Sequence, residues 1–452
     1  MSRVVVVGSG RSGLAVAAYL ARTGTETILT DRRAEPDPLT VQRLSELGVP
    51  GVWGEHPLTL LEGCEEVVLS PGVPPSISFV QEALHRHISV VGELELAHRV
   101  LRARNDGSVL LAVTGTNGKS TTTDLTAHLL KAAGVPAVAC GNLGTPLMAA
   151  IEHQAPGTRY ALECSSYQLE TIRDFHAEAA VILNLTPDHL ARHGTMEAYL
   201  DAKLRIFERQ TSQDLRLTPQ ADPTFDAFAP GHGQPFRFGW GTPKGPGAWC
   251  DSDGLLWLVD AEHRAEPLVH RKDLRIPGDH NVENALVASV LASHGGAGID
   301  GLRAGLRSYP GLAHRMVLCG EKDGVKAYND SKGTNVDATM TAIKALPGPL
   351  VLLLGGQDKG TPYEPLRRLL EGKLRRLVFL GEAIPKLEDE LGDLPHTTIE
   401  PFDEAVREAL RIAEAGDQVL LSPACASFDQ FNNFEERGDR FEALVREWLS
   451  GT

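Results

Sequence analysis

The sequence lacks any pair of cysteines spaced for metal or redox chemistry. Its six cysteines stand apart at positions 64, 140, 164, 250, 319 and 425, and no two form a C-x-x-C pair. This spacing disfavours both a zinc knuckle and a thioredoxin-like site. Scattered thiols in a chain of 452 residues are typical of a reducing compartment, so we expect a cytoplasmic location.

Long apolar runs and an excess of positive charge are also missing. No apolar stretch approaches the ~18 residues of a membrane-spanning helix, so we expect no membrane span. The first ten residues, MSRVVVVGSG, contain a valine run that is too short for a signal peptide. The net charge of −15 argues against a nucleic-acid partner, because phosphate backbones require a basic surface.

Short, almost wholly apolar runs alternate with helical patterns along most of the chain. Such runs are typical of parallel strands buried on both faces, and strands separated by helices form βαβ units. The strand candidates are residues 4–7, 67–70, 110–113, 181–185, 350–355, 377–381 and 418–422. We therefore predict an α/β fold.

Two breaks divide this pattern, RARNDGS at 102–108 and SYPGLAHR at 308–315. We predict three domains, over residues 1–98, 99–308 and 309–452. The stretch 217–250 is rich in glycine, proline and aromatic residues, and it is predicted to form hairpins and loops inserted in the central domain.

The first glycine loop follows a run of four valines. Gly8, Gly10 and Gly13 stand in G-x-G-x-x-G order before a helical pattern, and Asp31 ends the next strand 21 residues after Gly10. This is the fingerprint of a dinucleotide-binding unit, whose glycines let the backbone approach a diphosphate at a helix N-terminus. These residues alone leave NAD, another diphosphate nucleotide and a ligand-free turn open.

The second glycine loop, TGTNGKST at 114–121, also lies between an apolar strand and a helical pattern. It departs from the usual phosphate-loop pattern, which requires a glycine where Val113 stands. Backbone N–H groups can still surround phosphates, Lys119 supplies positive charge, and Ser120 or Thr121 can bind Mg²⁺. We predict that this loop binds a nucleotide.

Polar residues after two later strands are candidates for a metal site. Glu163 follows an apolar run in ALECSSYQLE, and His189 follows another in VILNLTPDHL. The carboxyl ends of parallel strands are the usual ligand-binding edge of α/β sheets. A zinc pair of His189 and His193 lacks a third ligand at suitable spacing. Lys203, in the helical pattern DAKLRIFE, reads as an ordinary solvent-facing lysine.

Eight motifs in a fixed order make the chain similar to a known family. They are TGTNGKST, GNLGTP, ECSSYQLE, NLTPDHL, DAKLRIF, GDHNVENALVA, AHRM and YNDSKGTNVDAT. Together they resemble the muramyl ligases, the ATP-dependent amino-acid ligases of peptidoglycan precursor synthesis. GSGRSG, GGQDKG and SPACASFDQFNNFEERGDRF resemble in particular the member that joins D-glutamate to UDP-N-acetylmuramoyl-L-alanine through an acyl phosphate. The resemblance implies a Rossmann-like N-terminal domain, a central P-loop-type ATPase domain with a small β insertion and a Rossmann-like C-terminal domain.

The resemblance also implies which residues bind each substrate. The first domain would bind the UDP of the sugar substrate rather than NAD, through Arg11, Ser12, Asp31, Arg32, Arg33, Ser70, Gly72 and Asn142. ATP would be bound by Gly115, Thr116, Asn117, Gly118, Lys119, Ser120, Thr121, Asn281, Asn284, Arg315 and Asp330. D-Glutamate would contact Thr334, Lys359, Ser427, Phe428 and Phe434, with Lys332 nearby.

The resemblance reverses the interpretation of Lys203. The matching lysine of the family is carbamylated by CO₂, and its carbamate helps to hold the second of two Mg²⁺ ions. The implied metal ligands are Ser120, Glu163, His189 and the Lys203 carbamate, and the implied catalytic residues are Lys119, Glu163, His189 and Lys203. The expected partners are small molecules only, UDP-N-acetylmuramoyl-L-alanine, D-glutamate and ATP, and we expect a monomer.

The chain departs from the family pattern at three positions. Ala191 stands where an aspartate is common, Gly333 where alanine is common, and Cys164 where a larger apolar residue is common. Gly333 is expected to loosen the start of a helix slightly. The remaining alternatives are an L-alanine-adding muramyl ligase, a folylpolyglutamate synthase, an NAD-dependent oxidoreductase and a nucleotide-regulated binding protein without catalysis.

Overall fold

The computed structural model describes residues 3–222, 225, 231–242 and 244–451, apart from the side chains of Leu190 and Ala191. The departure at Ala191 therefore lies outside what the structure describes. The chain divides into two compact units, residues 1–274 with 283–308 and residues 275–282 with 309–452. The predicted domain ranges stay a prediction. Within the described residues, no helix is both long enough and apolar enough to cross a membrane.

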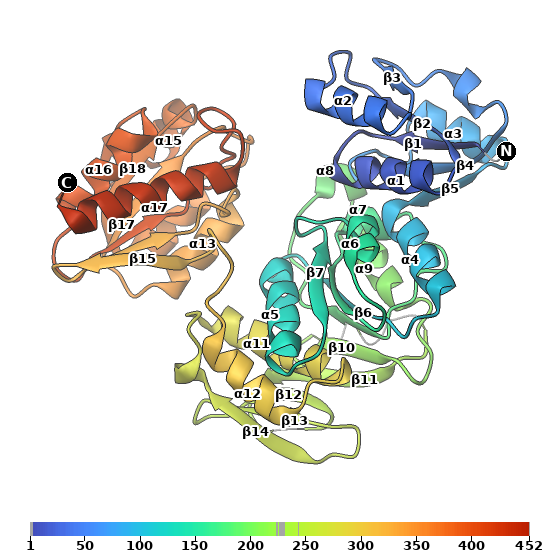
Figure 1. Ribbon diagram of the computed structural model, residues 1–452. Coiled ribbons are helices and arrows are strands. Elements are labelled where there is room, and N and C mark those ends of the chain that lie inside the picture. The colour runs from blue at the N-terminus through green and yellow to red at the C-terminus, as the bar shows by residue number, and fades with distance from the viewer. Residues whose placement is uncertain (1–2, 223–224, 226–230, 243, 452) are drawn as a thin grey trace. The chain divides into compact units, whose positions relative to one another are not determined.

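The first unit begins with a five-stranded parallel sheet (Figure 1). Its order, β3-β2-β1-β4-β5, is the order of dinucleotide-binding folds. Val5, Val6 and Val7 are fully buried because helices cover both faces of the central strand. The elements are β1 (Arg3–Val7), α1 (Arg11–Arg22), β2 (Glu26–Asp31), α2 (Pro38–Glu46), β3 (Gly51–Trp53), η1 (Leu58–Leu61), β4 (Cys64–Leu69), α3 (Ser78–His85), β5 (Ser89–Gly92) and α4 (Glu93–Arg104).

A second sheet of the first unit has the order β14-β13-β12-β11-β10-β9-β6-β8-β7. It is parallel from β7 to β12 and antiparallel at β13 and β14. Its strands are β6 (Val109–Thr114), β7 (Ala137–Gly141), β8 (Arg159–Glu163), β9 (Ala179–Ile182), β10 (Leu215–Pro219), β11 (Gln234–Trp240), β12 (Gly247–Cys250), β13 (Leu255–Val259) and β14 (Ala265–His270). The helices are α5 (Lys119–Ala132), α6 (Leu147–His153), α7 (Ser166–Leu169), α8 (Leu190–His193), α9 (Met196–Leu204), η2 (Arg205–Phe207), η3 (Arg271–Asp273), α11 (Asp279–His294) and α12 (Ile299–Ser308).

The prediction of hairpins over residues 217–250 is wrong for most of that stretch. Strands β10, β11 and β12 continue the parallel sheet, and the antiparallel pairs follow at β12–β13 and β13–β14. Glycine makes the parallel pairing of β11 and β12 possible, because a Cβ at Gly247 would lie 1.7 Å from the carbonyl oxygen of Arg237.

The second unit contains a six-stranded sheet of order β15-β16-β20-β17-β18-β19. It is parallel except for β15, which pairs antiparallel with β16. The elements are β15 (Val317–Lys322), β16 (Val325–Asn329), α13 (Val336–Ala345), β17 (Leu350–Gly355), η4 (Glu364–Leu366), α14 (Arg367–Leu370), β18 (Leu374–Leu380), α15 (Ile384–Leu391), β19 (His396–Thr398), α16 (Phe402–Ile412), β20 (Gln418–Leu421) and α17 (Phe434–Ser450). The predicted α/β class with mostly parallel sheets is confirmed.

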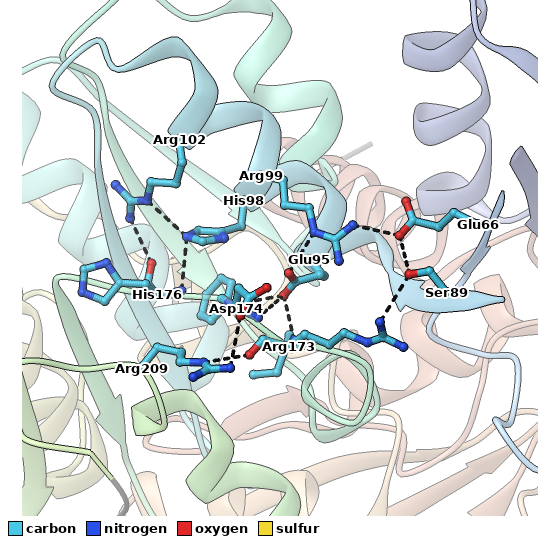
Figure 2. A network of polar contacts seen from close by, with 12 residues as sticks. Glu66, Ser89, Glu95, His98, Arg99, Arg102, Arg173, Asp174, His176 and Arg209 are labelled. Atoms are coloured by element: carbon cyan, nitrogen blue, oxygen red, sulfur yellow. Dashed lines mark hydrogen bonds and ion pairs between the residues drawn. The ribbon is translucent and has the colours of Figure 1, made fainter. Parts of the chain in front are cut away.

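Helix α4 fastens the N-terminal sheet to the segment that follows α7 (Figure 2). The buried carboxylate of Glu95 accepts hydrogen bonds from the backbone N–H groups of Arg173, Asp174 and Phe175 at 2.8, 3.0 and 3.0 Å. Arg99 pairs with the same carboxylate at 3.1 Å. A buried charge is tolerated only when its oxygens are bonded in this way, so the two parts of the first unit are held in a defined arrangement.

Candidate functional site

A cavity of about 650 Å³ lies at the carboxyl edge of the N-terminal sheet. It is found where the strand order reverses between β1 and β4, which is the typical ligand crevice of such sheets. Gly141 at the end of β7 and residues 142–146, which join β7 to α6, contribute to its wall. All eight residues predicted to bind the UDP substrate line this cavity: Arg11, Ser12, Asp31, Arg32, Arg33, Ser70, Gly72 and Asn142.

The carboxylate of Asp31 is held by its neighbours in this cavity. Ser9 donates to Oδ2 through its backbone N–H at 2.7 Å and its hydroxyl at 2.6 Å. Arg33 donates to Oδ1 through its backbone N–H at 2.9 Å. Burial raises the pKa of Asp31, but the hydrogen bonds from Arg33 and Ser9 outweigh it and hold the pKa well below its usual value. Asp31 is therefore a fixed anion beside two arginines of the loop.

The glycines of the first loop have different roles. A Cβ at Gly13 would lie 1.9 Å from the carbonyl oxygen of Gly8, so only glycine lets α1 approach β1 this closely. Gly10 is the N-cap of α1 and provides no side-chain cap, and a Cβ added there would meet nothing within 4 Å. The N-terminus of α1 is thus open toward the cavity, where backbone N–H groups favour an anion.

Two polar side chains that line the cavity were missed from the sequence, His56 and Gln168. His56 follows β3, and its Nδ1 lies 2.9 Å from the hydroxyl of Thr30. Its position just after the carboxyl end of a strand was a usable signal. Gln168 completes a capping box with Ser165 at the start of α7. Its side chain therefore has a structural role in addition to its place in the cavity wall.

The second glycine loop lies between β6 and α5 and is closed on itself. Lys119 donates from Nζ to the carbonyl oxygens of Gly115 at 2.9 Å and Thr116 at 2.7 Å. The backbone N–H groups of Thr116 and Asn117 donate to Oδ1 of Asn184 at 3.1 and 2.8 Å. The loop therefore gathers a lysine and backbone N–H groups, the groups of a phosphate site, in one small region, and these groups are bonded within the protein.

The end of this loop is packed against α11. Gly118 has φ +84°, and a Cβ there would lie 2.5 Å from Oδ1 of Asn284. The same oxygen accepts a hydrogen bond from the hydroxyl of Thr122 at 3.0 Å. Asn284 thus belongs to the wall of the phosphate loop. Ser120 and Thr121 lie in the first turn of α5, directly after Lys119.

Glu163 ends β8 and is buried, with 2% of its surface exposed. Its Oε1 accepts a hydrogen bond from the side chain of Asn142 at 2.8 Å, and its backbone oxygen accepts one from the N–H of Asn142 at 2.9 Å. Its Oε2 is buried and has no hydrogen-bond partner among the described residues. A buried carboxylate oxygen without a donor fits a cation ligand, because leaving it unpaired is costly.

Lys203 lies on α9 and is 1% exposed, so the interpretation as a solvent-facing lysine is wrong. Its Nζ donates to the carbonyl oxygen of Gly115 at 2.8 Å and lies 4.4 Å from the ring centre of Tyr199. Burial, and then the charge of Lys119, lower the pKa of Lys203 to about 6. The amine is consequently mostly uncharged at neutral pH.

His189 has a left-handed backbone, with φ +54°, and a side chain that is 44% exposed. Its Nδ1 lies 3.0 Å from the hydroxyl of Tyr167. Burial lowers its pKa, and Lys119 and Lys203 lower it further against the opposing effect of Asp188. The imidazole is therefore favoured in its neutral form, the form that binds metals.

A zinc site at His189 and His193 finds no third ligand in the part of the chain that the structure describes. No group of three or more His, Cys, Asp or Glu side chains there could hold a metal ion. His193 instead lies 2.9 Å from the hydroxyl of Ser166 and 3.3 Å from Glu170.

The remaining ATP candidates belong to the second unit. Asn281 is buried in the first turn of α11, the part of that helix that belongs to the second unit, and it donates to the carbonyl oxygen of Pro277. Asp330 follows β16, and its Oδ2 accepts a hydrogen bond from Ser422 at 2.7 Å. Burial raises the pKa of Asp330 to about 6, although Arg315 lowers it. Arg315 has a buried Nε without a partner among the described residues.

Gly333 lies outside any helix, which corrects one expectation. It precedes Asn335, the N-cap of α13, so glycine there does not loosen a helix. A Cβ at Gly333 would lie 2.5 Å from Oδ2 of Asp330. Glycine therefore lets the chain pass close to this carboxylate.

Four of the five D-glutamate candidates lie in loops after three neighbouring strands, β16, β17 and β20. Gln357 and Ala426 form an isolated bridge that joins the loop of Lys359 to the loop of Ser427 and Phe428. Ser427 is buried, whereas Lys359 and Phe428 are exposed. Thr334 precedes α13 and Phe434 begins α17.

One buried side chain that the sequence did not single out ties these loops together. Arg437, 1% exposed, donates to the carbonyl oxygens of Ser331, Cys425 and Ala426 at 2.9, 3.2 and 3.1 Å. It also donates to the hydroxyl of Ser331 at 3.0 Å. The loops after β16 and β20 therefore share one support.

Comparison with known families finds three matches along the chain. Residues 2–92 match the Mur ligase MurD-like N-terminal domain, residues 113–292 the Mur ligase middle domain, and residues 314–425 the Mur ligase glutamate ligase domain. The chain is 38% identical over 450 residues to the UDP-N-acetylmuramoylalanine–D-glutamate ligase of Caldanaerobacter subterraneus subsp. tengcongensis, covering 98% of each chain. It is 41% identical over 461 residues to the enzyme of the same name from Anaeromyxobacter dehalogenans, covering 99% of this chain and 98% of the relative.

Solved structures share the fold at low identity. The UDP-N-acetylmuramate-alanine ligase MurC of Thermotoga maritima is 18% identical with a TM-score of 0.60, and the match covers 100% of both chains. MurF of Acinetobacter baumannii is 16% identical with a TM-score of 0.62, and the match covers 98% of this chain and 93% of that one. With near-full-length relatives far above 30% identity and all three domains matched, this chain belongs to the Mur ligase family.

Proposed function

We propose that this protein is the ligase that joins D-glutamate to UDP-N-acetylmuramoyl-L-alanine with hydrolysis of ATP, in peptidoglycan precursor synthesis. The observation that carries the proposal is the cavity in which all eight predicted UDP-substrate residues meet, in the same compact unit as a separate loop built for phosphate. Two nucleotides thus have two sites. The choice of D-glutamate rests on the relatives that bear this name along their whole length.

The reaction must activate a carboxylate, because an amine cannot displace oxide from it at neutral pH. A carboxylate oxygen of the alanyl group attacks the γ-phosphorus of ATP, the bond from that phosphorus to the bridging oxygen breaks, and ADP leaves. The amine of D-glutamate then attacks the carbonyl carbon of the acyl phosphate. Inorganic phosphate leaves with the former carboxylate oxygen, and the amine loses a proton.

The loop at 115–121 would hold the triphosphate. Lys119 would neutralise charge on the transferred phosphate, which requires its Nζ to exchange the carbonyl oxygens of Gly115 and Thr116 for phosphate oxygens. Asn284 supports this loop through Gly118 and Thr122. In the second unit, Asn281, Arg315 and Asp330 would contact the rest of the nucleotide.

Mur ligases use ATP with Mg²⁺, which reduces the repulsion between an anionic nucleophile and the triphosphate when it is bound. The residues present fit such an ion. Ser120 and the unpaired Oε2 of Glu163 would be oxygen ligands, and His189 would add its neutral imidazole. The presence of two ions is part of this proposal.

Carbamylation of Lys203 is a further part of the proposal. The amine is buried beside Gly115 and mostly uncharged, and an uncharged amine is the form that reacts with CO₂. A carbamate would replace a repelling cation with oxygen ligands near Glu163 and His189. D-Glutamate would be bound in the second unit by Thr334, Lys359, Ser427, Phe428 and Phe434, with donors for its two carboxylates.

The decisive experiment measures phosphate release from ATP with UDP-N-acetylmuramoyl-L-alanine and, in turn, D-Glu, L-Glu, L-Ala and D-Asp. We expect release with D-Glu alone. Release with L-Ala and UDP-N-acetylmuramate would instead indicate the L-alanine-adding ligase. A run without amino acid is the control for uncoupled hydrolysis. Tight NADH binding without any phosphate release would overturn the proposal in favour of an oxidoreductase. A monomer in the cytoplasm stays a prediction.

A further inference from the structure

One segment of the cavity wall comes from outside the N-terminal sheet. Residues 142–146 join β7 to α6, and Gly141, Asn142, Gly144 and Pro146 line the cavity. Within this segment, which we call the wall loop, the N–H of Thr145 donates to the carbonyl oxygen of Leu143 at 2.8 Å. The carbonyl oxygen of Thr145 also accepts a hydrogen bond from the N–H of Gly141 at 2.8 Å, so the loop is closed onto the end of β7. Two further supports come from other parts of the fold.

The first support is at Asn142. Its backbone N–H and its side chain both donate to Glu163, at 2.9 and 2.8 Å. This contact links the wall loop to the carboxylate that is the candidate metal ligand. The start of the loop is thereby fixed to the end of β8.

The second support is Glu93, at the other end of the loop. Helix α6 begins after Pro146, which provides no side-chain cap. Instead, Oε1 of Glu93 accepts a hydrogen bond from the backbone N–H of Met148 at 2.7 Å. Glu93 is the first residue of α4 and lies 55 residues away in the chain, so the cap comes from a different part of the fold.

The surroundings of Glu93 make this an unusual use of a carboxyl group. Glu93 is 1% exposed, and its Oε2 is buried with no hydrogen-bond partner among the described residues. Leu94, Leu147 and Met148 belong to one apolar cluster. Burial of a carboxyl group here costs free energy, and the hydrogen bond from the N–H of Met148 satisfies only one of its two oxygens.

We propose that Glu93 is a positioning residue for the sugar-nucleotide substrate, acting through α6 and the wall loop rather than by touching the ligand. It fixes the end of the wall loop, and Asn142 with Glu163 fixes its start. Loss of the Glu93 cap lets α6 and residues 143–146 shift, so the cavity loses its shape for the substrate. This inference rests on the proposed function, since it names the ligand of the cavity.

The test replaces Glu93 with residues that keep or remove its acceptor. Glu93→Leu has a similar size and suits the apolar surroundings but leaves the N–H of Met148 without an acceptor, whereas Glu93→Gln keeps an oxygen for it. We expect the Kd of UDP-N-acetylmuramoyl-L-alanine, measured by calorimetry, to rise at least about tenfold in Glu93→Leu, since an unsatisfied buried donor disturbs the loop. In Glu93→Gln we expect most of the affinity to return, and in both variants the Kd of ATP should change little.

Leu101 provides a stability control on the same helix. It is buried, with 2% of its surface exposed, and belongs to the same apolar cluster as Leu147 and Met148. Leu101→Ala should lower the melting temperature, because it leaves a cavity in that cluster, while the Kd of the sugar nucleotide stays unchanged. If Leu101→Ala weakened that ligand as much as Glu93→Leu, a general loosening of α4 would explain the data and the positioning role would be overturned.

The outcomes separate the two proposals. If the wild-type protein does not bind UDP-N-acetylmuramoyl-L-alanine, the proposed function fails. If the wild type binds it and folded Glu93→Leu binds it equally well, only the role of Glu93 fails. Should Glu93→Leu not fold, Glu93→Asp, with its carboxylate withdrawn by one methylene, takes its place. The same rise in Kd is then expected, and unchanged binding again overturns the role.

Discussion

The two glycine loops of the first unit both connect a strand to a helix, but they differ in how their polar groups are bonded. In the loop after β1, glycine serves close packing, since Gly13 lets α1 touch the carbonyl of Gly8, and the N-terminus of α1 stays open. In the loop after β6, Lys119 closes the turn on the carbonyl oxygens of Gly115 and Thr116. The first loop is a preformed crevice, and the second must exchange internal bonds for those of its ligand.

This difference separates binding from chemistry. A nucleotide that is bound but does not react needs a rigid crevice with fixed charges, such as Asp31 with Ser9 and Arg33. A nucleotide that reacts needs a cation that can follow the transferred phosphate, which a lysine on a flexible stem provides. The loops therefore respond differently to substitution.

The largest effect is expected at the second loop. Lys119→Ala should fold normally and lower kcat by at least about 100-fold, because positive charge at the transferred phosphate is lost. Phosphate release and circular dichroism check both parts. Lys131→Ala, in the last turn of the same helix and exposed, is the matched control and should keep full activity. Near-normal turnover in folded Lys119→Ala would remove ATP from this loop.

The next largest effect is expected at Lys203, which contacts the second loop through Gly115. Lys203→Ala should fold and lose most activity, and a short carboxylic acid such as acetate at high concentration should restore part of it. The acid would fill the vacated space with an anionic oxygen ligand in place of the carbamate. The assay is phosphate release over a series of acetate concentrations. Inactivity without rescue would favour a structural role for Lys203, whose Nζ also bonds Gly115.

The first loop should instead be sensitive to packing. Gly13→Ala places a methyl group against the carbonyl of Gly8 and should lower the free energy of unfolding by about 3 kcal/mol. Gly10→Ala has open space and φ −71°, so only the poorer N-cap counts, and the stability should fall by no more than about 1 kcal/mol while the sugar nucleotide binds more weakly. Thermal unfolding and calorimetry separate these effects. Equal stability of the two variants would contradict the assigned roles.

The parallel sheets could be predicted because their strands are buried on both faces and so appear as continuous apolar runs. Residues 350–355 and 418–422, for example, correspond to β17 and β20. The segment after β10 could not be predicted, because glycine and proline indicate turns equally well in hairpins and in parallel extensions of a sheet. In the folded chain, the close packing of Gly247 against Arg237 accompanies the parallel pairing.

The polar site was less visible in the sequence. The first loop and Asp31 belong to a sequence fingerprint whose spacing predicts a strand, a turn and a helix around a ligand. Lys203 and Glu93 belong to no such pattern. Charged residues in helical patterns usually face solvent, so the burial of these two was not expected. Their burial follows from which helices pack together, and this is a property of the folded chain. Residue types alone could not reveal it.

A smaller effect should separate the two nucleotides. Arg33 donates to Asp31, both line the cavity, and neither belongs to the phosphate loop. Arg33→Ala should weaken UDP-N-acetylmuramoyl-L-alanine by about tenfold, the loss expected for one charged hydrogen bond, and leave ATP binding unchanged. Calorimetric titration of each ligand measures this. A parallel loss of both ligands would show that the loops are not independent.

The smallest effect is a pH dependence at Asp31, which ends β2 and lines the same cavity as the first loop. The folded-state pKa of Asp31 lies below its usual value of 3.8, because hydrogen bonds from Arg33 and Ser9 outweigh the effect of burial. The stability that Asp31 contributes is therefore present above pH 3.8 and is lost as pH falls below it. Melting temperatures of the wild type and Asp31→Asn, measured from about pH 6 downward, should converge at the acid end, because the variant has no proton to gain. If the two curves stay parallel, the carboxylate is not held as an anion in the folded state. The crevice beside the first loop would then lack the fixed charge that distinguishes it from the second loop.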